Sequence, residues 1–263
     1  MDQMFNDIRE LVKYRELLLN IAVREIKIRY KQSVLGIFWT ILQPLLMMAI
    51  FTLIFSRFAR IPSDGLPYPV FSYTALLPWT FFATSLSFAI PSLVTNSSLL
   101  TKIYFPREIF PMASILAATV DFFIAGVVFS VILIFYGISV TPYALYIIPI
   151  VFVQVMFTLA VALFASAMNV YYRDIRYALP FFIQIWMFLC PIIYPVSLVP
   201  ERFRTLYMLN PMAPIIDGYR NVLLKGAPPE YGYLGIAAVI TLVMLFLSYK
   251  YFKKVEMSFA DKI

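Results

Sequence analysis

The sequence predicts an all-α membrane protein with six transmembrane helices and both termini in the cytoplasm. Hydrophobic residues make up 62% of the 263 residues and charged residues only 13%, whereas an average soluble domain is roughly 45–50% apolar and about 25% charged. The mean hydropathy of +0.84 points the same way. The 21 Lys and Arg exceed the 14 Asp and Glu, an excess that membrane proteins usually carry in their cytoplasmic loops.

Stretches without charge place the spans, because a helix needs about 20 mostly apolar residues to cross the hydrocarbon. We expect Pro78 and Pro91 to bend or end the second span, and Gly137 with Thr141 and Pro142 to separate the third from the fourth. No internal repeat or soluble domain is evident, so we expect one membrane domain. The predicted spans are residues 36–56, 70–94, 111–136, 144–168, 177–196 and 231–250.

The distribution of basic residues predicts the orientation of these spans. With six spans, both termini and the loops after the second and fourth spans lie on one side of the membrane, and together they hold 15 Lys and Arg. The segments on the opposite side hold 6. Cytoplasmic loops carry the excess of Lys and Arg. The sequence therefore predicts a multi-pass protein of the cell (inner) membrane with its termini in the cytoplasm. The basic excess marks orientation, and we expect no nucleic-acid partner.

Residues 1–35 are predicted to form a cytoplasmic interfacial helix at the headgroups of the membrane lipids. Leu11, Tyr14, Leu18 and Ile21 recur at helical spacing and form an apolar face. The basic residues Arg24, Lys27 and Lys31 share another face. Two roles stay open for this helix, a plain membrane anchor and a contact surface for a partner.

The predicted cytoplasmic loop after the second span, residues 96–111, is unusually apolar. It contains Leu99, Leu100, Ile103, Tyr104 and Phe105. Apolar side chains presented to the cytoplasm favour docking into a partner. The alternative is a short helix folded back against its own bundle.

The longest predicted outside loop, residues 197–230, is also apolar, and Pro211 and Pro214 break it. Non-helical backbone at membrane depth must be buried in protein or line a wet cavity. Short re-entrant or gating helices between spans five and six fit this pattern, with an interfacial lid as the alternative. The external-gate candidates are Tyr207, Asn210, Pro211, Tyr219 and Arg220.

Composition excludes several kinds of catalysis. The chain has no histidine and one cysteine, Cys190, so Ser-His-Asp or Cys-His chemistry and histidine metal ligands are absent. We therefore predict no catalytic residue and no metal site, and an inert buried thiol at Cys190. Asp121 is the only charged residue well inside a predicted span. A packing role is favoured for it, with a hydrogen bond to Thr119 or to a facing helix.

Short motifs that occur in order along nearly the whole chain resemble the membrane subunit of ABC-2-type polysaccharide exporters, the permeases that export O-antigen and teichoic acid. The most specific are the run from Arg29 to Trp39, followed by Gln43-Pro44, and Phe105-Pro106-Arg107-Glu108. The later motifs are Tyr172-Arg173-Asp174, Pro191 to Pro195, Asn210-Pro211-Met212, Gly218-Tyr219-Arg220 and Phe259-Ala260-Asp261.

The resemblance implies a single ABC-2-type transmembrane domain over residues 1–263, working as a homodimer with two copies of a separate ATPase subunit. None of the eight glycines is followed by Lys, so this chain has no GxxxxGK[ST] loop to hold nucleotide phosphates. We expect no cofactor in this chain, with ATP and Mg bound to the partner ATPase.

The resemblance also implies roles for individual residues. The loop after the second span becomes a coupling helix in a cleft of the ATPase, and the amino-terminal helix moves with it as a gate. The substrate path runs among spans one, two and five, where aromatic rings can stack on sugars. The coupling residues are Leu99, Lys102, Tyr104, Phe105, Pro106, Arg107 and Glu108, the gate residues Arg24, Lys27, Arg29 and Tyr30, and the channel-lining candidates Trp39, Trp79, Phe82 and Trp186.

These observations leave three functions open. The first is a permease subunit that exports a lipid-linked, O-antigen-like polysaccharide with ATP hydrolysed by the partner chain. The second is an ion-coupled secondary transporter without an ATPase, for which Asp121 is the available acid. The third, a membrane enzyme acting on lipid-linked sugars, lacks the clustered carboxylates that such chemistry needs.

Overall fold

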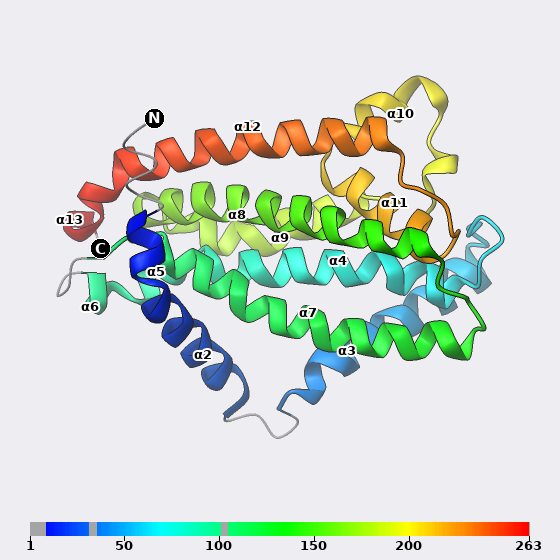
Figure 1. Ribbon diagram of the computed structural model, residues 1–263, viewed down its shortest axis with the longest axis horizontal. Coiled ribbons are helices and arrows are strands. Elements are labelled where there is room, and N and C mark those ends of the chain that lie inside the picture. Colours follow the sequence, from blue (N-terminus) through cyan, green and yellow to red (C-terminus); the bar gives the residue numbers. More distant parts are fainter. Residues whose placement is uncertain (1–8, 32–35, 101–104, 263) are drawn as a thin grey trace.

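The computed structural model describes residues 9–31, 36–100 and 105–262. Within these ranges the chain is helical and contains no β-strand, which confirms the all-α prediction (Figure 1). The elements are α2 (Arg15–Lys31), α3 (Phe38–Phe51), η1 (Thr52–Phe58), α4 (Tyr68–Ala89), α5 (Ser92–Thr95), α6 (Ser97–Leu100), α7 (Ile109–Phe135), η2 (Pro142–Tyr146), α8 (Ile147–Tyr171), α9 (Asp174–Phe188), η3 (Val196–Leu198), α10 (Glu201–Met208), α11 (Met212–Leu223), α12 (Tyr231–Val255), η4 (Glu256–Ser258) and α13 (Phe259–Lys262).

Four helical segments of the described chain are long and apolar enough to cross a membrane: Phe38–Phe58, Ile109–Phe135, Pro142–Tyr171 and Tyr231–Ser258. They overlap the first, third, fourth and sixth predicted spans. The second and fifth predicted spans fall on α4 and α9, which are helical but less suited to crossing alone. α4 is rich in tyrosine, serine and threonine, and α9 has 15 residues, a length of about 22 Å at the helical rise.

Prolines define where two of these helices end. α4 stops at Ala89, shortly before Pro91, while Pro78 lies inside the helix and does not end it. α9 stops at Phe188, short of the predicted residue 196, because Pro191 and Pro195 interrupt the segment that follows. The predicted end of the second span at Pro91 is therefore confirmed.

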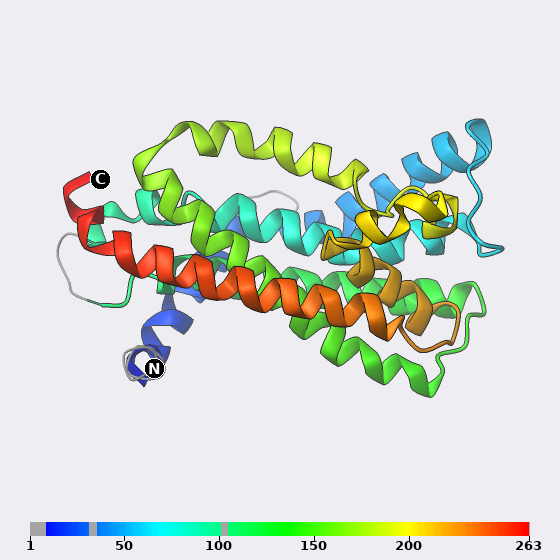
Figure 2. The ribbon, with the colours of Figure 1, turned by 90° about the horizontal axis from the view of Figure 1, so that it is seen from above.

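α4 forms the centre of the bundle. Most of its side chains are buried, and it packs against α3, α7, α8 and α11. α12 lies along α8 on one face (Figure 1). α9 differs from α4 and α12, because none of its residues is buried. Figure 2 shows α9 along one side of the bundle.

The two short helices expected between residues 197 and 230 are present as α10 and α11. α11 is buried in the protein from Met212 to Val222. The Arg220 guanidinium lies 3.5 Å from the centroid of the Phe71 ring, and its Nη2 donates to the carbonyl oxygen of Ile192 at 2.9 Å. Arg220 thus supplies a donor to backbone that no longer has a helical partner, and this contact holds α11 inside the bundle.

The ends of the long helices divide the molecule into two poles (Figure 1). α5, α6 and α13 lie at one pole, where α12 ends. α10, α11 and η2 lie at the other. The start of α2 and the carboxy-terminal helix α13 lie at the same pole (Figure 1).

Candidate functional site

The amino-terminal helix α2 lies against the side of the bundle with its apolar face inward. Ile21 and Ala22 are buried, and Leu11, Tyr14 and Leu18 pack against the same cluster. The amphipathic face predicted from the spacing is therefore confirmed. The predicted basic face is partly wrong, because Lys27 and Lys31 are exposed but Arg24 turns toward the bundle.

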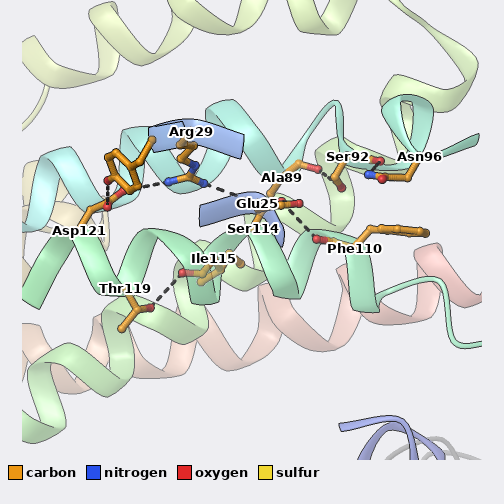
Figure 3. A network of polar contacts seen from close by, with 11 residues as sticks. Glu25, Arg29, Ala89, Ser92, Asn96, Phe110, Ser114, Ile115, Thr119 and Asp121 are labelled. Carbon is orange, nitrogen blue, oxygen red and sulfur yellow. Dashed lines mark hydrogen bonds and ion pairs between the residues drawn. The ribbon is translucent and has the colours of Figure 1, made fainter. Parts of the chain in front are cut away.

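The last turn of α2 is tied to α7 through one carboxylate. Arg29 Nη1 donates to Asp121 Oδ2 at 2.9 Å, and the Tyr30 hydroxyl donates to Asp121 Oδ1 (Figure 3). The Tyr30 oxygen also lies 2.9 Å from Thr40 Oγ1 on α3. Both oxygens of Asp121 thus have donors, and one residue of α7 fixes α2 beside α3.

Two further contacts hold the middle of α2. Ser114 Oγ on α7 donates to Glu25 Oε1 at 3.0 Å (Figure 3). Arg24 Nη2 donates to Asn96 Oδ1. Asn96 lies between α5 and α6, at the start of the loop predicted to couple to an ATPase. We name these contacts together with those of Arg29 and Tyr30 to Asp121 the α2 latch.

Asp121 differs from its expected surroundings. Thr119 Oγ1 donates to the carbonyl oxygen of Ile115 in its own helix at 3.0 Å and does not contact Asp121. The partners of Asp121 come from α2, a helix outside the predicted spans. Glu25, Asn96 and Ser114 were not candidates, because nothing in the sequence specifies which face of α7 receives α2.

A cavity of about 410 Å³ opens beside the α2 latch, between α2, α3, α4 and α7. The Arg29 guanidinium lies 3.7 Å from the centroid of the Phe88 ring. Its side chain is 10% exposed, and its Nε and Nη2 have no hydrogen-bond acceptor among the described residues. Further polar lining comes from Tyr30, Thr40, Gln43, Thr80, Thr84 and Asp121, and aromatic lining from Trp39, Phe81, Phe88 and Phe122.

This lining combines hydrogen-bond donors with flat apolar surfaces. The hydroxyls of Thr40, Thr80 and Thr84 can donate or accept hydrogen bonds with polar groups of a ligand. Trp39, which is 48% exposed, offers a ring face on which a sugar can stack. The cavity is within the size range of small-molecule sites, about 300–1,000 Å³.

Burial raises the pKa of Glu25 above its ordinary value, against the hydrogen bond from Ser114 and the charges of Arg29 and Arg24, which lower it. Arg29 Nη2 lies 4.0 Å from Glu25 Oε2. Docking of α2 therefore favours the protonated form of Glu25.

Five of the seven predicted coupling residues lie among the described residues, and each of these five is at least half-buried. Lys102 and Tyr104 lie outside the described residues. Leu99 and Arg107 are half-buried, and Phe105, Pro106 and Glu108 are buried. Phe105 is 5% exposed and packs edge-on against the ring of Phe110. The ring of Phe105 is thus covered by the chain's own apolar cluster, in line with the alternative of a segment folded back against its own bundle.

Two of the channel candidates are also placed differently from the prediction. Trp79 is 4% exposed and Phe82 is fully buried. Phe82 stacks on Phe157 and meets the edge of Trp186, so it is part of the protein core and does not line a path in this conformation. Trp39 borders the cavity beside α2, and Trp186 is half-buried.

The external-gate candidates divide in the same way. Trp186 Nε1 donates to Asn210 Oδ1 at 3.0 Å. With Tyr207 and Pro211, both residues border an open hollow of about 720 Å³ between α9, α10 and α12. Tyr219 and Arg220 are buried and hold α11, so in this conformation they present no surface to an external mouth. Cys190 is buried, as predicted.

A bundle in which four long helical segments are apolar enough to cross a membrane defines the class of an α-helical membrane protein. Residues 16–224 match the ABC-2 type transporter family, so the chain belongs to this family. The chain is 31% identical over 263 residues to the O-antigen export system permease protein RfbA of Myxococcus xanthus, covering 99% of this chain and 100% of that protein. RfbA of Klebsiella pneumoniae is 29% identical over 94% of each chain, and the polysialic acid transport protein KpsM of Escherichia coli is 21% identical over 86% of this chain and 88% of its own.

Replacing Asp121 with Asn should loosen α2 from the bundle. Arg29 would keep its charge in a mostly buried place with only the more distant Glu25, 4.0 Å from its Nη2, as a counter-charge, at a cost of roughly 3 kcal/mol, the lower end for breaking a buried ion pair. Amide hydrogen exchange in α2 should accelerate by about a hundredfold, since each 1.4 kcal/mol changes an equilibrium tenfold. Asp174→Asn, at an exposed acid, is the matched control. Equal exchange in both variants would show that Asp121 does not hold α2.

Attachment of α2 should also depend on pH through Glu25. The pKa of Glu25 is raised on docking above its ordinary value of 4.5, so the docked helix favours the protonated carboxyl. This contribution is fully present below about pH 4.5 and is lost as the pH rises through the raised pKa of the docked state. Hydrogen exchange of α2 should therefore speed up with rising pH beyond its intrinsic pH dependence. Glu25→Gln should remove that extra dependence, and its persistence in the variant would assign it to another group.

Proposed function

We propose that this protein is the membrane-spanning permease subunit of an ATP-driven transporter that exports a lipid-linked, O-antigen-like polysaccharide across the cell (inner) membrane. The observation that carries the proposal is the similarity over 99% of the chain to an O-antigen export permease. Six spans with both termini in the cytoplasm agree with the division of the bundle into two poles.

The energy source in this proposal is a separate ATPase. Membership of the ABC-2 family implies such a partner, and no glycine of the sequence is followed by Lys, so the chain lacks the usual phosphate-binding loop. Two ATPase copies, with ATP and Mg, would contact the pole at which α5 and α6 lie. They would move the predicted loop after the second span, residues 96–111, which we name the coupling segment.

A second copy of this chain completes the transporter in the proposal. α9 supports it, since it has no buried residue and presents large aromatic side chains. Tyr177 is 79% exposed, Phe181 63% and Phe182 62%. A partner protomer would cover this face, and the path for the glycan would run between the two copies.

The α2 latch connects the coupling segment to the cavity. Arg24 bonds to Asn96 at the start of that segment, and Arg29 and Tyr30 line the cavity. Movement of the segment by the ATPase would pull on α2 and widen the cavity, where Trp39 and Arg29 would receive sugar rings and polar groups. Arg24, Arg29 and Tyr30 act as gate residues in this proposal.

The alternative, an ion-coupled transporter, finds less support. A coupling carboxylate must release its ligands to take up an ion or proton, and both oxygens of Asp121 accept hydrogen bonds from α2. Membership of the ABC-2 family also favours the ATP-driven function.

The proposal predicts a complex with an ATPase that depends on the coupling segment. The purified chain alone should hydrolyse no ATP, and a complex of two permease and two ATPase chains should be recovered by native mass spectrometry. Tyr104→Ala should weaken that complex by about 2 kcal/mol or more, as expected of an interface hot spot. Tyr231→Ala, 56% exposed at the opposite pole, should leave it intact. Assembly unaffected by Tyr104→Ala, or ATP hydrolysis by the chain alone, would contradict the proposal.

A further inference from the structure

The loop that enters α7 and the end of α12 are joined by a buried ion pair. Lys253 Nζ lies 2.9 Å from Glu108 Oε1, and Glu108 is 1% exposed. Glu108 directly precedes the first residue of α7, and Lys253 lies in the last turn of α12. Each charge also has the sign that stabilises its own helix end. The pair therefore fixes the start of one long helix to the end of another.

A second contact runs between the same two segments. Arg107 Nη1 donates to the carbonyl oxygen of Glu256, which follows α12. Carbonyl groups at the end of a helix lack intrahelical donors, so Arg107 supplies one. Lys253 Nζ also lies 3.3 Å from Glu256 Oε2. We name the contacts among Arg107, Glu108, Lys253 and Glu256 the carboxy-terminal clamp.

Phe259 anchors the clamp in the core. It is fully buried, with ring centroids 5.4 Å from Phe252 and 6.4 Å from Tyr171. The Arg107 guanidinium lies 5.9 Å from the Phe259 centroid. Phe105 belongs to the same apolar cluster. The motif that begins at Phe259 has no role in the proposed function, and the structure places its aromatic ring under the coupling loop.

We infer that the carboxy-terminal clamp is a positioning device for energy coupling, and this inference rests on the proposed function. A displacement of the coupling segment is transmitted to α7 only if residues 105–108 keep their position relative to α7. The clamp keeps these residues in position, because separating Lys253 from Glu108 would leave a buried carboxylate without its counter-charge. Through α7 the displacement reaches Asp121 and hence α2. Arg107, Glu108 and Lys253 act through α7 and touch no substrate.

The test measures export and ATP hydrolysis by the same complexes. Cells that lack their own copy of this gene are complemented with each variant, and the initial rate of surface polysaccharide appearance is divided by the ATPase rate of membranes from those cells. The variants are Lys253→Met and the double variant Glu108→Gln with Lys253→Met. Lys254→Met, at an exposed neighbour in the same turn, is the matched control.

Export per ATP should fall by about two- to thirtyfold in both clamp variants, the usual range for residues that carry coupling, while hydrolysis and assembly persist. The double variant should regain much of the thermal stability that Lys253→Met loses, since Glu108, the fully buried acid of the clamp, then carries no charge, yet it should stay uncoupled. Lys254→Met should behave as the unmodified chain.

Two results would overturn the inference. An unchanged ratio in Lys253→Met would show that coupling does not pass through the clamp. A ratio restored together with stability in the double variant would assign the clamp a structural role only. An unmodified chain that restores no export would instead contradict the proposed function, and the inference with it.

Discussion

The ion pair between Arg29 and Asp121 is the interaction on which the arrangement of the site depends. A carboxylate on an apolar helix is costly unless it is paired and hydrogen-bonded, and here α2 supplies both donors. This requirement fixes the rotation of α2 about its own axis as well as its place along α7. Tyr30 then meets Thr40 at the start of α3, so one pair sets the positions of three helices and the wall of the cavity.

α7 links the features that the proposed function uses. Its amino terminus is held by the carboxy-terminal clamp, its middle receives the α2 latch, and its rings pack on α4, where Phe122 meets Phe81 and Phe129 stacks on Tyr73. Interiors packed in this way shift between discrete arrangements more readily than they bend. Under the proposed function, α7 carries displacement from the coupling segment to the helix that borders the cavity.

The sequence predicts the helices well because both signals it uses are local. Charge-free length identifies the long helices, and spacing identifies the buried face of α2, which Ile21 and Leu18 form. Partners distant in sequence are not accessible in this way. Arg29 and Asp121 lie 92 residues apart, and no local pattern joins them. The sequence likewise does not distinguish an aromatic ring that faces lipid from one that lines the substrate path or packs against a neighbouring helix. For this reason the prediction places Phe82 in the channel, whereas the structure places it in the core. Phe105 shows the same ambiguity in a loop.

The account is tested most directly in sealed vesicles that contain the permease and its ATPase, with the ATPase facing outward. Uptake of the lipid-linked glycan is measured with ATP, and separately with a proton or sodium gradient in vesicles without the ATPase. An ATP-driven permease should take up the glycan with ATP and should take up none with a gradient alone. Gradient-driven uptake without the ATPase, abolished by Asp121→Asn, would contradict it and make Asp121 the coupling acid.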